Sequence, residues 1–244
     1  MTMENGVLYI ASGSSYIDDA IESAESVKEY TNLPITLVAD RTVDNPHFDT
    51  EITSDDFLYH YGDSVLQIPE LPYENTILLD TDTIVSDNFE ELFSLASNFD
   101  IAAATIAESK FGLGEKVPEA LPEFNTGVVL FNKNERTADF IQMWKEIYKQ
   151  YLEENVRMNQ PAFREALFRS PVQFMTIPTE YNCRANFGGY LTEKVKILLG
   201  SLDEPETILD KLNEYIAPRV YFNTDGRLHV EKVNTTNNRF GTTL

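Results

Sequence analysis

The chain has 244 residues, of which 42% are hydrophobic and 11% aromatic, and it carries a formal net charge of −21. Its length and composition are typical of one globular α/β domain or two small ones, and they exclude a disordered chain. The single cysteine, Cys183, excludes an internal disulfide, and the acidic charge disfavours nucleic acids and anionic membranes as partners.

The first half of the chain alternates between strand and helix patterns. An apolar run at residues 7–11 predicts a buried strand. A Gly/Ser turn follows, and apolar residues at helical spacing predict an amphipathic helix over residues 16–30. A second strand is expected at residues 35–39, ending at Asp40, whereas the polar segment 41–61 gives no clear prediction.

The middle of the chain contains the most informative segment. Residues 76–79 form a short apolar strand pattern that runs into Asp80-Thr81-Asp82, and residues 83–85 continue it. A helix is expected over residues 89–97 and a strand over 101–106. The glycines and prolines of residues 110–124 predict a loop that covers a site.

The remaining segments complete a single α/β domain. The predicted elements, in chain order, are a strand at 126–131, helices at 136–151 and 160–168, strands at 172–177 and 195–199, and a helix at 202–215. Asp225-Gly226 lies between two short apolar runs and predicts a β-hairpin near the C-terminus. No repeat or low-complexity linker interrupts residues 1–244, and no segment predicts a signal peptide or a transmembrane helix. We therefore expect one domain in the cytoplasm.

Asp80 and Asp82 are the leading candidates for a functional site. In open α/β sheets, ligands bind at the carboxyl ends of strands, which is where this pair lies. Two carboxylates separated by one residue suit a hard divalent cation, which in turn bridges the two phosphates of a nucleotide diphosphate. The alternative is a turn in which the two aspartates only cap the backbone.

The same residues also match other classes of protein. The segment 80–85 resembles the first motif of haloacid-dehalogenase-type phosphatases, in which the first aspartate is the nucleophile and the second the general acid. That family places the motif near the start of the chain and needs a later acidic pair, whereas the later aspartates here occur singly. A dinucleotide fingerprint is absent, because Gly112 and Gly114 lack a third glycine and follow no strand.

Residues 71–85 are similar to the "P-y-x-x-h-l-y-L-D-x-D-t" signature of glycosyltransferase family 8 and its relatives. Four later segments resemble further motifs of that family in the same order, namely residues 123–131 ("F-N-S/T-G-v"), 159–163 ("D-Q"), 180–184 ("W-N" or "Y-N") and 194–200 ("I-x-H-F/G"). The resemblance implies a GT-A fold, which is a Rossmann-like fold with a mixed, mostly parallel central sheet flanked by helices. It also implies that residues 1–100 form a nucleotide-binding half and residues 101–244 a half for donor sugar, acceptor and hairpin.

The implied activity is transfer of a sugar, with retention, from a nucleotide-diphosphate sugar to an acceptor hydroxyl. A UDP-sugar is the expected donor, Mn²⁺ or Mg²⁺ the expected cofactor, and a glycan, lipid-linked sugar or protein the expected acceptor. An acidic protein must neutralise such an anionic donor with a cation or a few basic side chains, and this favours a metal.

The resemblance assigns a role to each candidate residue. Asp80 and Asp82 hold the metal, and Thr81 lies between them in the diphosphate site. Residues 11–16 surround the nucleobase: Tyr16 stacks on it beside Ala11 and Ser12, and Asp40 accepts one of its N–H groups. Asn125 and Gln160 form hydrogen bonds with donor-sugar hydroxyls, and Arg184 and Lys196 reach a phosphate. For Tyr16, Asp40, Asn125, Gln160, Arg184 and Lys196, a purely structural or surface role is the alternative.

Two departures from the family pattern affect the metal site and the sugar site. Leu199 stands where the family has a metal-binding histidine, and leucine cannot ligate a cation. His229 is a replacement only if the C-terminal hairpin folds back over the site. Asn159 replaces an aspartate before Gln160. A nucleotide-sugar-binding protein with little or no catalysis therefore stays open as an alternative, whereas a transferase acting on nucleic-acid bases is opposed by the net charge.

Overall fold

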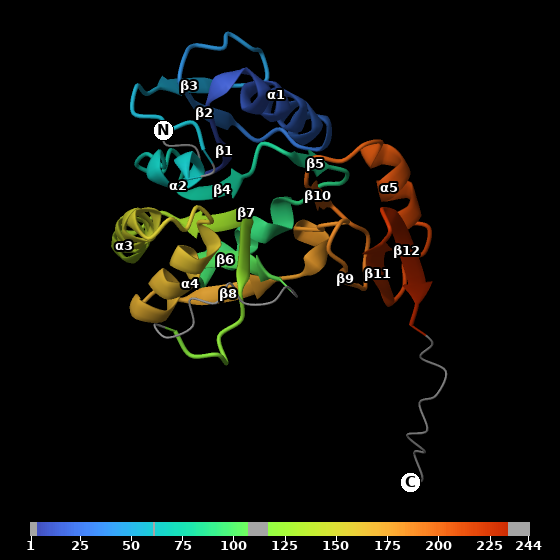
Figure 1. Ribbon diagram of the computed structural model, residues 1–244. Coiled ribbons are helices and arrows are strands. Elements are labelled where there is room, and N and C mark those ends of the chain that lie inside the picture. The colour runs from blue at the N-terminus through green and yellow to red at the C-terminus, as the bar shows by residue number, and fades with distance from the viewer. Residues whose placement is uncertain (1–3, 61, 107–116, 234–244) are drawn as a thin grey trace.

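The computed structural model describes residues 4–60, 62–106 and 117–233. Their central feature is a seven-stranded sheet with the order β3-β2-β1-β4-β7-β6-β8 (Figure 1). Its strands are β1 (Asn5–Ala11), β2 (Ile35–Ala39), β3 (Thr50–Thr53), β4 (Asn75–Leu79), β6 (Ile101–Thr105), β7 (Phe124–Asn132) and β8 (Phe174–Ile177). Only β7 runs antiparallel to its neighbours, β4 and β6. The predicted mixed, mostly parallel sheet is therefore confirmed.

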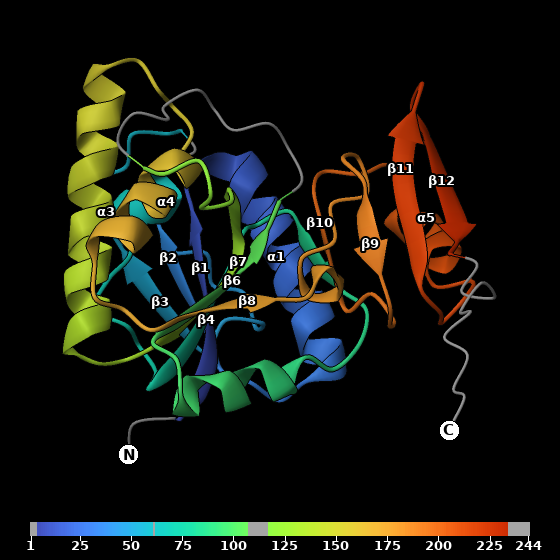
Figure 2. The same cartoon turned by 90° about the horizontal axis from the view of Figure 1, so that it is seen from below.

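Helices cover both faces of this sheet (Figure 2). One face packs against α1 (Gly13–Tyr30) and the 3₁₀ helix η1 (Glu90–Ser97). The other face packs against α2 (Asp63–Leu66), α3 (Glu135–Glu153) and α4 (Gln160–Arg169). Because both faces are covered, the inner strands contain continuous apolar runs, residues 7–11 in β1 and 77–79 in β4.

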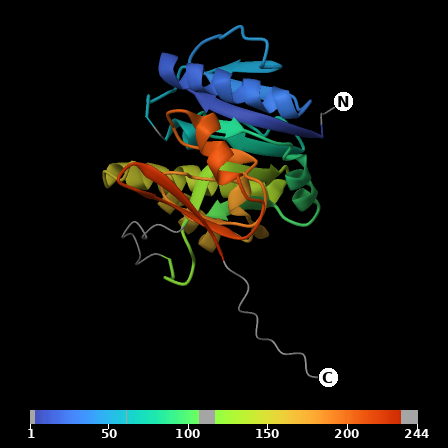
Figure 3. The ribbon, with the colours of Figure 1, turned by 90° about the vertical axis from the view of Figure 1, so that its right-hand side faces the viewer.

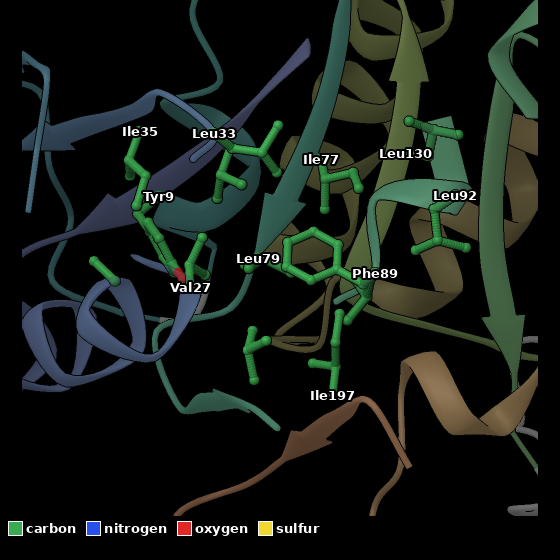
Figure 4. Packing of buried hydrophobic residues seen from close by; sticks show 14 of the residues in the cluster. Tyr9, Val27, Leu33, Ile35, Ile77, Leu79, Phe89, Leu92, Leu130 and Ile197 are labelled. Carbon is green, nitrogen blue, oxygen red and sulfur yellow. The ribbon is translucent and has the colours of Figure 1, made fainter. Parts of the chain in front are cut away.

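The core beneath α1 shows how alternate strand residues build one layer. Tyr9 of β1 and Ile77 and Leu79 of β4 point to the same side of the sheet (Figure 4). They meet Val27 of α1 and Phe89 at the start of η1, and all five side chains are buried. This packing fixes the end of β4, where the aspartate pair begins.

The C-terminal part of the chain forms two further sheets beside the main one (Figures 1 and 3). Strand β5 (Thr83–Val85) comes directly after the aspartate pair in the sequence. Strand β10 (Ile197–Leu199) pairs antiparallel with it. A three-stranded sheet joins β9 (Gly189–Leu191), β11 (Arg219–Thr224) and β12 (Arg227–Lys232), next to α5 (Pro205–Leu212). The short 3₁₀ helix η2 (Thr179–Tyr181) precedes this region.

The predicted hairpin is confirmed. Strands β11 and β12 pair antiparallel, and their turn places Asp225 at φ +52° and Gly226 at φ +72°. Two consecutive positive φ angles are typical of the tight turn that Asp-Gly favours.

Some elements differ from the expectation. The predicted helix at 89–97 is a 3₁₀ helix, strands β3 and β9 were not predicted, and the expected covering loop at 110–124 lies partly outside the described residues. None of the described helices is long and apolar enough to cross a membrane.

Candidate active site

A cavity of about 600 Å³ lies at the carboxyl ends of β1 and β4. Its lining includes seven of the predicted site residues, Ala11, Ser12, Tyr16, Asp80, Thr81, Asp82 and Gln160. Its other lining residues are Ile10, Asp19, His60, Asp63, Ser64, Thr126, Met158, Asn159 and Ser201. Segments far apart in the sequence therefore meet around the aspartate pair.

A chain of hydrogen bonds fixes the backbone of Asp80. Its N–H group donates to the carbonyl of Gly127 at 2.8 Å, which ties the end of β4 to β7. Its own carbonyl accepts from the hydroxyl of Thr83 at 2.9 Å. The Thr83 hydroxyl is also 2.7 Å from that of Ser23, which in turn lies 2.7 Å from the Tyr9 hydroxyl. This network in the core holds the turn rigid beneath the carboxylates.

Asp82 is held by the residues that follow β10. The N–H group of Gly200 donates to the Asp82 carbonyl at 3.0 Å, and the Ser201 N–H group donates to its carboxylate. Both donors come directly after β10 in the sequence, and the pairing of β10 with β5 brings them next to Asp82. The late strand therefore orients Asp82.

The two carboxylates are unfavourable for each other in their charged forms. Burial raises the pKa of Asp80 to about 8, the charge of Asp82 adds to the rise, and Arg184 opposes it. Burial also raises the pKa of Asp82, with a further contribution from Asp19, whereas Ser201 and Arg184 lower it. Such a pair is stabilised by a nearby positive charge.

The lining of this cavity is strongly acidic. Four aspartates line it, Asp19, Asp63, Asp80 and Asp82, and the described lining residues include no lysine or arginine. Asp63 already accepts hydrogen bonds from the Ser12 hydroxyl and from two backbone N–H groups. Of the other three, Asp19 lies near enough to Asp82 for its charge to raise the pKa of Asp82.

The predicted nucleobase residues lie around the start of α1. Tyr16 lines the cavity and is 42% exposed, so part of its ring is open to a ligand. Asp40 does not line the cavity: one carboxylate oxygen accepts from the Gly13 N–H group at 3.1 Å. Its other oxygen is buried, accepts no hydrogen bond among the described residues and lies 3.5 Å from Arg41.

The opposite wall of the cavity is tied together through Asn159. Its side chain accepts from the Thr126 hydroxyl at 2.9 Å and donates to the Ser64 hydroxyl at 3.1 Å. Its carbonyl accepts from the Trp144 ring N–H at 3.2 Å. Gln160 follows as the first residue of α4 and lines the cavity. Asn159 therefore positions the start of the helix that presents Gln160.

Asn125 lies behind the cavity wall and not on it. Its side-chain oxygen accepts from the N–H group of Gly127 at 2.8 Å and from the amide of Asn182 at 2.9 Å. Gly127 lies in the bulge of β7, between Asn125, which pairs with Ala104, and Val129, which pairs with Ala103. Asn125 thus links the Gly127 segment, which binds Asp80, to Asn182.

The two predicted basic residues differ in placement. Arg184 lies outside the cavity lining, but its charge lowers the pKa of both Asp80 and Asp82. Lys196 forms an ion pair with Glu91 and lies 5.4 Å from the centre of the Tyr181 ring. It does not line the cavity, so the geometry gives no support to Lys196 as a phosphate ligand.

Neither Leu199, at the position of the family histidine, nor its possible replacement His229 offers a metal ligand to the cavity. Leu199 is buried, and its methyl groups pack against Gly127, where an added Cβ would lie 2.7 Å away. His229 is exposed on β12 and stacks on Phe222 at 5.2 Å, and it does not line the cavity. Within the described residues, no group of three or more His, Cys, Asp or Glu side chains is arranged to hold a metal ion.

Asp19 is the most informative residue that the sequence analysis missed. It lies three residues after Tyr16 on α1, so both face the cavity from the same side of the helix. That spacing was the available signal. The other missed residues, including His60 and Ser201, carry no motif and reach the cavity only through the tertiary fold.

No protein-family model and no curated protein matches this sequence. Several solved structures match at low sequence identity. The galactosyltransferase LgtC, solved with donor and acceptor sugar analogues, is 16% identical with a TM-score of 0.57, over 75% of each chain. Mouse xyloside xylosyltransferase 1 is 16% identical with a TM-score of 0.52, over 82% of this chain and 98% of its own.

The glycosyltransferase GlyE of Streptococcus pneumoniae TIGR4 is 19% identical with a TM-score of 0.54, over 75% of this chain. The match covers 47% of GlyE, so this chain spans about half of that protein's length. These neighbours share the mixed sheet, with helices on both faces, that is described above. The chain therefore has the GT-A fold.

Proposed function

We propose that this protein is a glycosyltransferase related to family 8, and that it moves a sugar from a UDP-sugar to an acceptor hydroxyl with retention. The observation that carries the proposal is the position of Asp80 and Asp82 in the large cavity, whose described lining residues include no lysine or arginine. The GT-A fold supports it, because structures with this fold include glycosyltransferases, one of them solved with donor and acceptor analogues.

The residues present fit a divalent cation. Asp80 and Asp82 are hard oxygen ligands on one turn, and both carboxylates are unfavourable without a positive charge nearby. Asp80 and Asp82 would hold such a cation together with oxygens from outside the protein. A bound Mn²⁺ or Mg²⁺ supplies positive charge at the leaving diphosphate.

Different side chains bind the nucleobase and the donor sugar. Tyr16 stacks on the uracil ring, beside Ala11 and Ser12, whereas Asp40 holds the N–H group of Gly13 and so positions the start of α1. Gln160 donates to a hydroxyl of the donor sugar. Asn125 acts as a positioning residue, since its hydrogen bonds hold the Gly127 segment against Asp80.

The transfer step needs no nucleophile from the protein. The oxygen of the acceptor hydroxyl forms a bond to the anomeric carbon on the face from which the diphosphate leaves. The bond between that carbon and the diphosphate oxygen breaks, its electron pair stays with UDP, and the hydroxyl proton passes to the departing diphosphate or to water. Arg184 lies near enough to the aspartate pair to favour the developing negative charge.

A nucleotide-sugar-binding protein without efficient catalysis is the second candidate. The observation that favours it is Leu199, which is packed against Gly127 where a third metal ligand would be useful. Binding alone needs the same cavity, so the two candidates differ in turnover.

Asp82→Asn tests the enzymatic role. We expect Mn²⁺-dependent hydrolysis of UDP-glucose or UDP-galactose to fall at least about hundredfold, because the variant removes one ligand charge at the diphosphate. Asp18→Asn is the matched control, since Asp18 is exposed on α1 and does not line the cavity. An unchanged rate in Asp82→Asn would contradict the proposed role. Failure of the wild type to hydrolyse any UDP-hexose, with UDP binding intact, would favour the binding protein.

A further inference from the structure

A second cavity, of about 360 Å³, shares no lining residue with the first one. Residues from the end of β6, from η2, from β9 and from β11 form its wall. The segment that leads into β9 supplies Asn182, Arg184, Phe187 and Gly188, and β9 itself supplies Gly189 and Tyr190.

Hydrogen bonds connect this second cavity to the aspartate pair. Asn182 in its wall donates to the side-chain oxygen of Asn125 at 2.9 Å, and the Gly127 N–H group donates to the same oxygen. The Gly127 carbonyl accepts from Asp80 at 2.8 Å. Arg184, also in the wall, acts through its charge on both aspartates. The wall of the second cavity is therefore linked to the aspartate pair through Asn125 and Gly127, and through the charge of Arg184.

Two aromatic rings at this cavity are open to solvent. Phe187 is 56% exposed and Tyr190 is 50% exposed. The guanidinium of Arg184 lies 3.6 Å from the centre of the Phe187 ring, which covers one face and fixes the orientation of the ring. Exposed, oriented aromatic faces are poorly solvated and favour a ligand with an apolar C–H surface.

The wall also contains an unsatisfied polar group. Asn182 is only 4% exposed, and its side-chain oxygen accepts no hydrogen bond among the described residues. A buried carbonyl oxygen without a donor is unfavourable, so a hydroxyl group delivered by a ligand would stabilise it. The hydroxyls of Thr105 and Thr179 also line this cavity.

The floor of the cavity depends on two glycines. Gly188 has φ +97°, and an added Cβ there would lie 2.9 Å from the Tyr221 carbonyl. An added Cβ at Gly189 would lie 2.8 Å from the Tyr221 hydroxyl. The chain thus passes directly over the buried Tyr221 and leaves the aromatic rings at the rim.

We infer that the second cavity binds a pyranose ring of a carbohydrate acceptor. One face of a pyranose consists largely of C–H bonds, which pack on Phe187 and Tyr190, and its edge carries hydroxyls that donate to Asn182. The role as acceptor site rests on the proposed glycosyltransferase function. The binding of a saccharide by these residues does not depend on it, so the two can fail separately.

Saturation-transfer NMR on the full chain, without donor or metal, tests the inference. The probes are methyl β-D-glucopyranoside, methyl β-D-galactopyranoside and methyl N-acetyl-β-D-glucosaminide. We expect at least one to show saturation transfer with the wild type and to lose it in Phe187→Ala/Tyr190→Ala. Thermal stabilisation by UDP with Mn²⁺ should persist in the variant, which also confirms that the variant is folded.

Phe168→Ala/Tyr30→Ala is the matched control, because these rings are 51% and 37% exposed and line neither cavity. The control should retain the saccharide signal. Signals that persist in the Phe187/Tyr190 variant, or binding of none of the three probes to the wild type, would overturn the inference. Absence of UDP stabilisation in every protein would instead count against the proposed function.

Discussion

Replacing Asp80 with asparagine separates the electrostatic cost of the aspartate pair from its proposed use in holding a cation. Asparagine has nearly the same shape as aspartate and keeps the backbone hydrogen bonds to Gly127 and Thr83. It removes one of the two charges that oppose each other. We therefore expect Asp80→Asn to stabilise the metal-free protein and to abolish stabilisation by Mn²⁺.

The size of the effect follows from the pKa of Asp80. A difference of one in pKa corresponds to about 1.4 kcal/mol, so a rise from 3.8 to about 8 sets an upper limit of roughly 6 kcal/mol at high pH. Asp80 is half-buried and lines the cavity, so contact with solvent screens its charge. We expect about 1–2 kcal/mol, or a rise in Tm of roughly 3–6 °C.

The pH dependence has a defined sign. Because the folded state holds its proton more tightly than the unfolded chain, the wild type loses stability as pH rises from about 4 to about 8. The advantage of Asp80→Asn should therefore be small at pH 5 and largest at pH 8. Thermal unfolding of both proteins in a metal chelator, at several pH values, measures it.

Asp87→Asn is a control, because the pKa of Asp87 is lowered whereas that of Asp80 is raised. Asp87 forms an ion pair with Lys194 at 3.0 Å, and the Lys194 side chain lowers its pKa. Its removal should give no stabilisation at pH 8. Our account of the aspartate pair would be refuted if Asp80→Asn were less stable than the wild type at pH 8 in chelator, or if Mn²⁺ stabilised both equally.

Two other substitutions test the charge and the ligand set of the cavity. Asp19→Asn should tighten metal-free binding of UDP several-fold in calorimetry, because it removes a lining carboxylate that opposes an anionic ligand. Unchanged affinity would show that Asp19 does not repel the bound diphosphate. Leu199→His should raise Mn²⁺ affinity about tenfold, since position 199 lies beside the aspartate pair on β10, while lost packing on Gly127 lowers stability. Affinity equal to that of the wild type would place position 199 out of reach of the metal.

The main elements of the fold were predictable because local pattern and tertiary burial agree in them. The apolar runs of β1 and β4 are covered on both faces, and α1 and α3 bury a regular stripe. Strand β3 was not predictable in this way, since its side chains are mostly exposed and polar. Strand β9 has only three residues, two of them glycine and an exposed tyrosine.

The site divides along the same line. Asp80, Asp82 and Tyr16 carry local patterns, and all three line the cavity. Lys196 shows what the sequence alone does not contain, because its partner Glu91 lies 105 residues away. The same applies to Asn125, because its partner Asn182 lies 57 residues away in the sequence. The hydrogen bond to Asn182 keeps the Asn125 side chain behind the cavity wall.

The most direct test of the proposed function is titration calorimetry of the wild type with UDP, with and without Mn²⁺. If Asp80 and Asp82 hold a cation that binds the diphosphate, UDP should bind at least about tenfold more tightly with Mn²⁺, and the gain should disappear in Asp82→Asn. UDP affinity that is the same with and without Mn²⁺, or no UDP binding in either condition, would contradict the account.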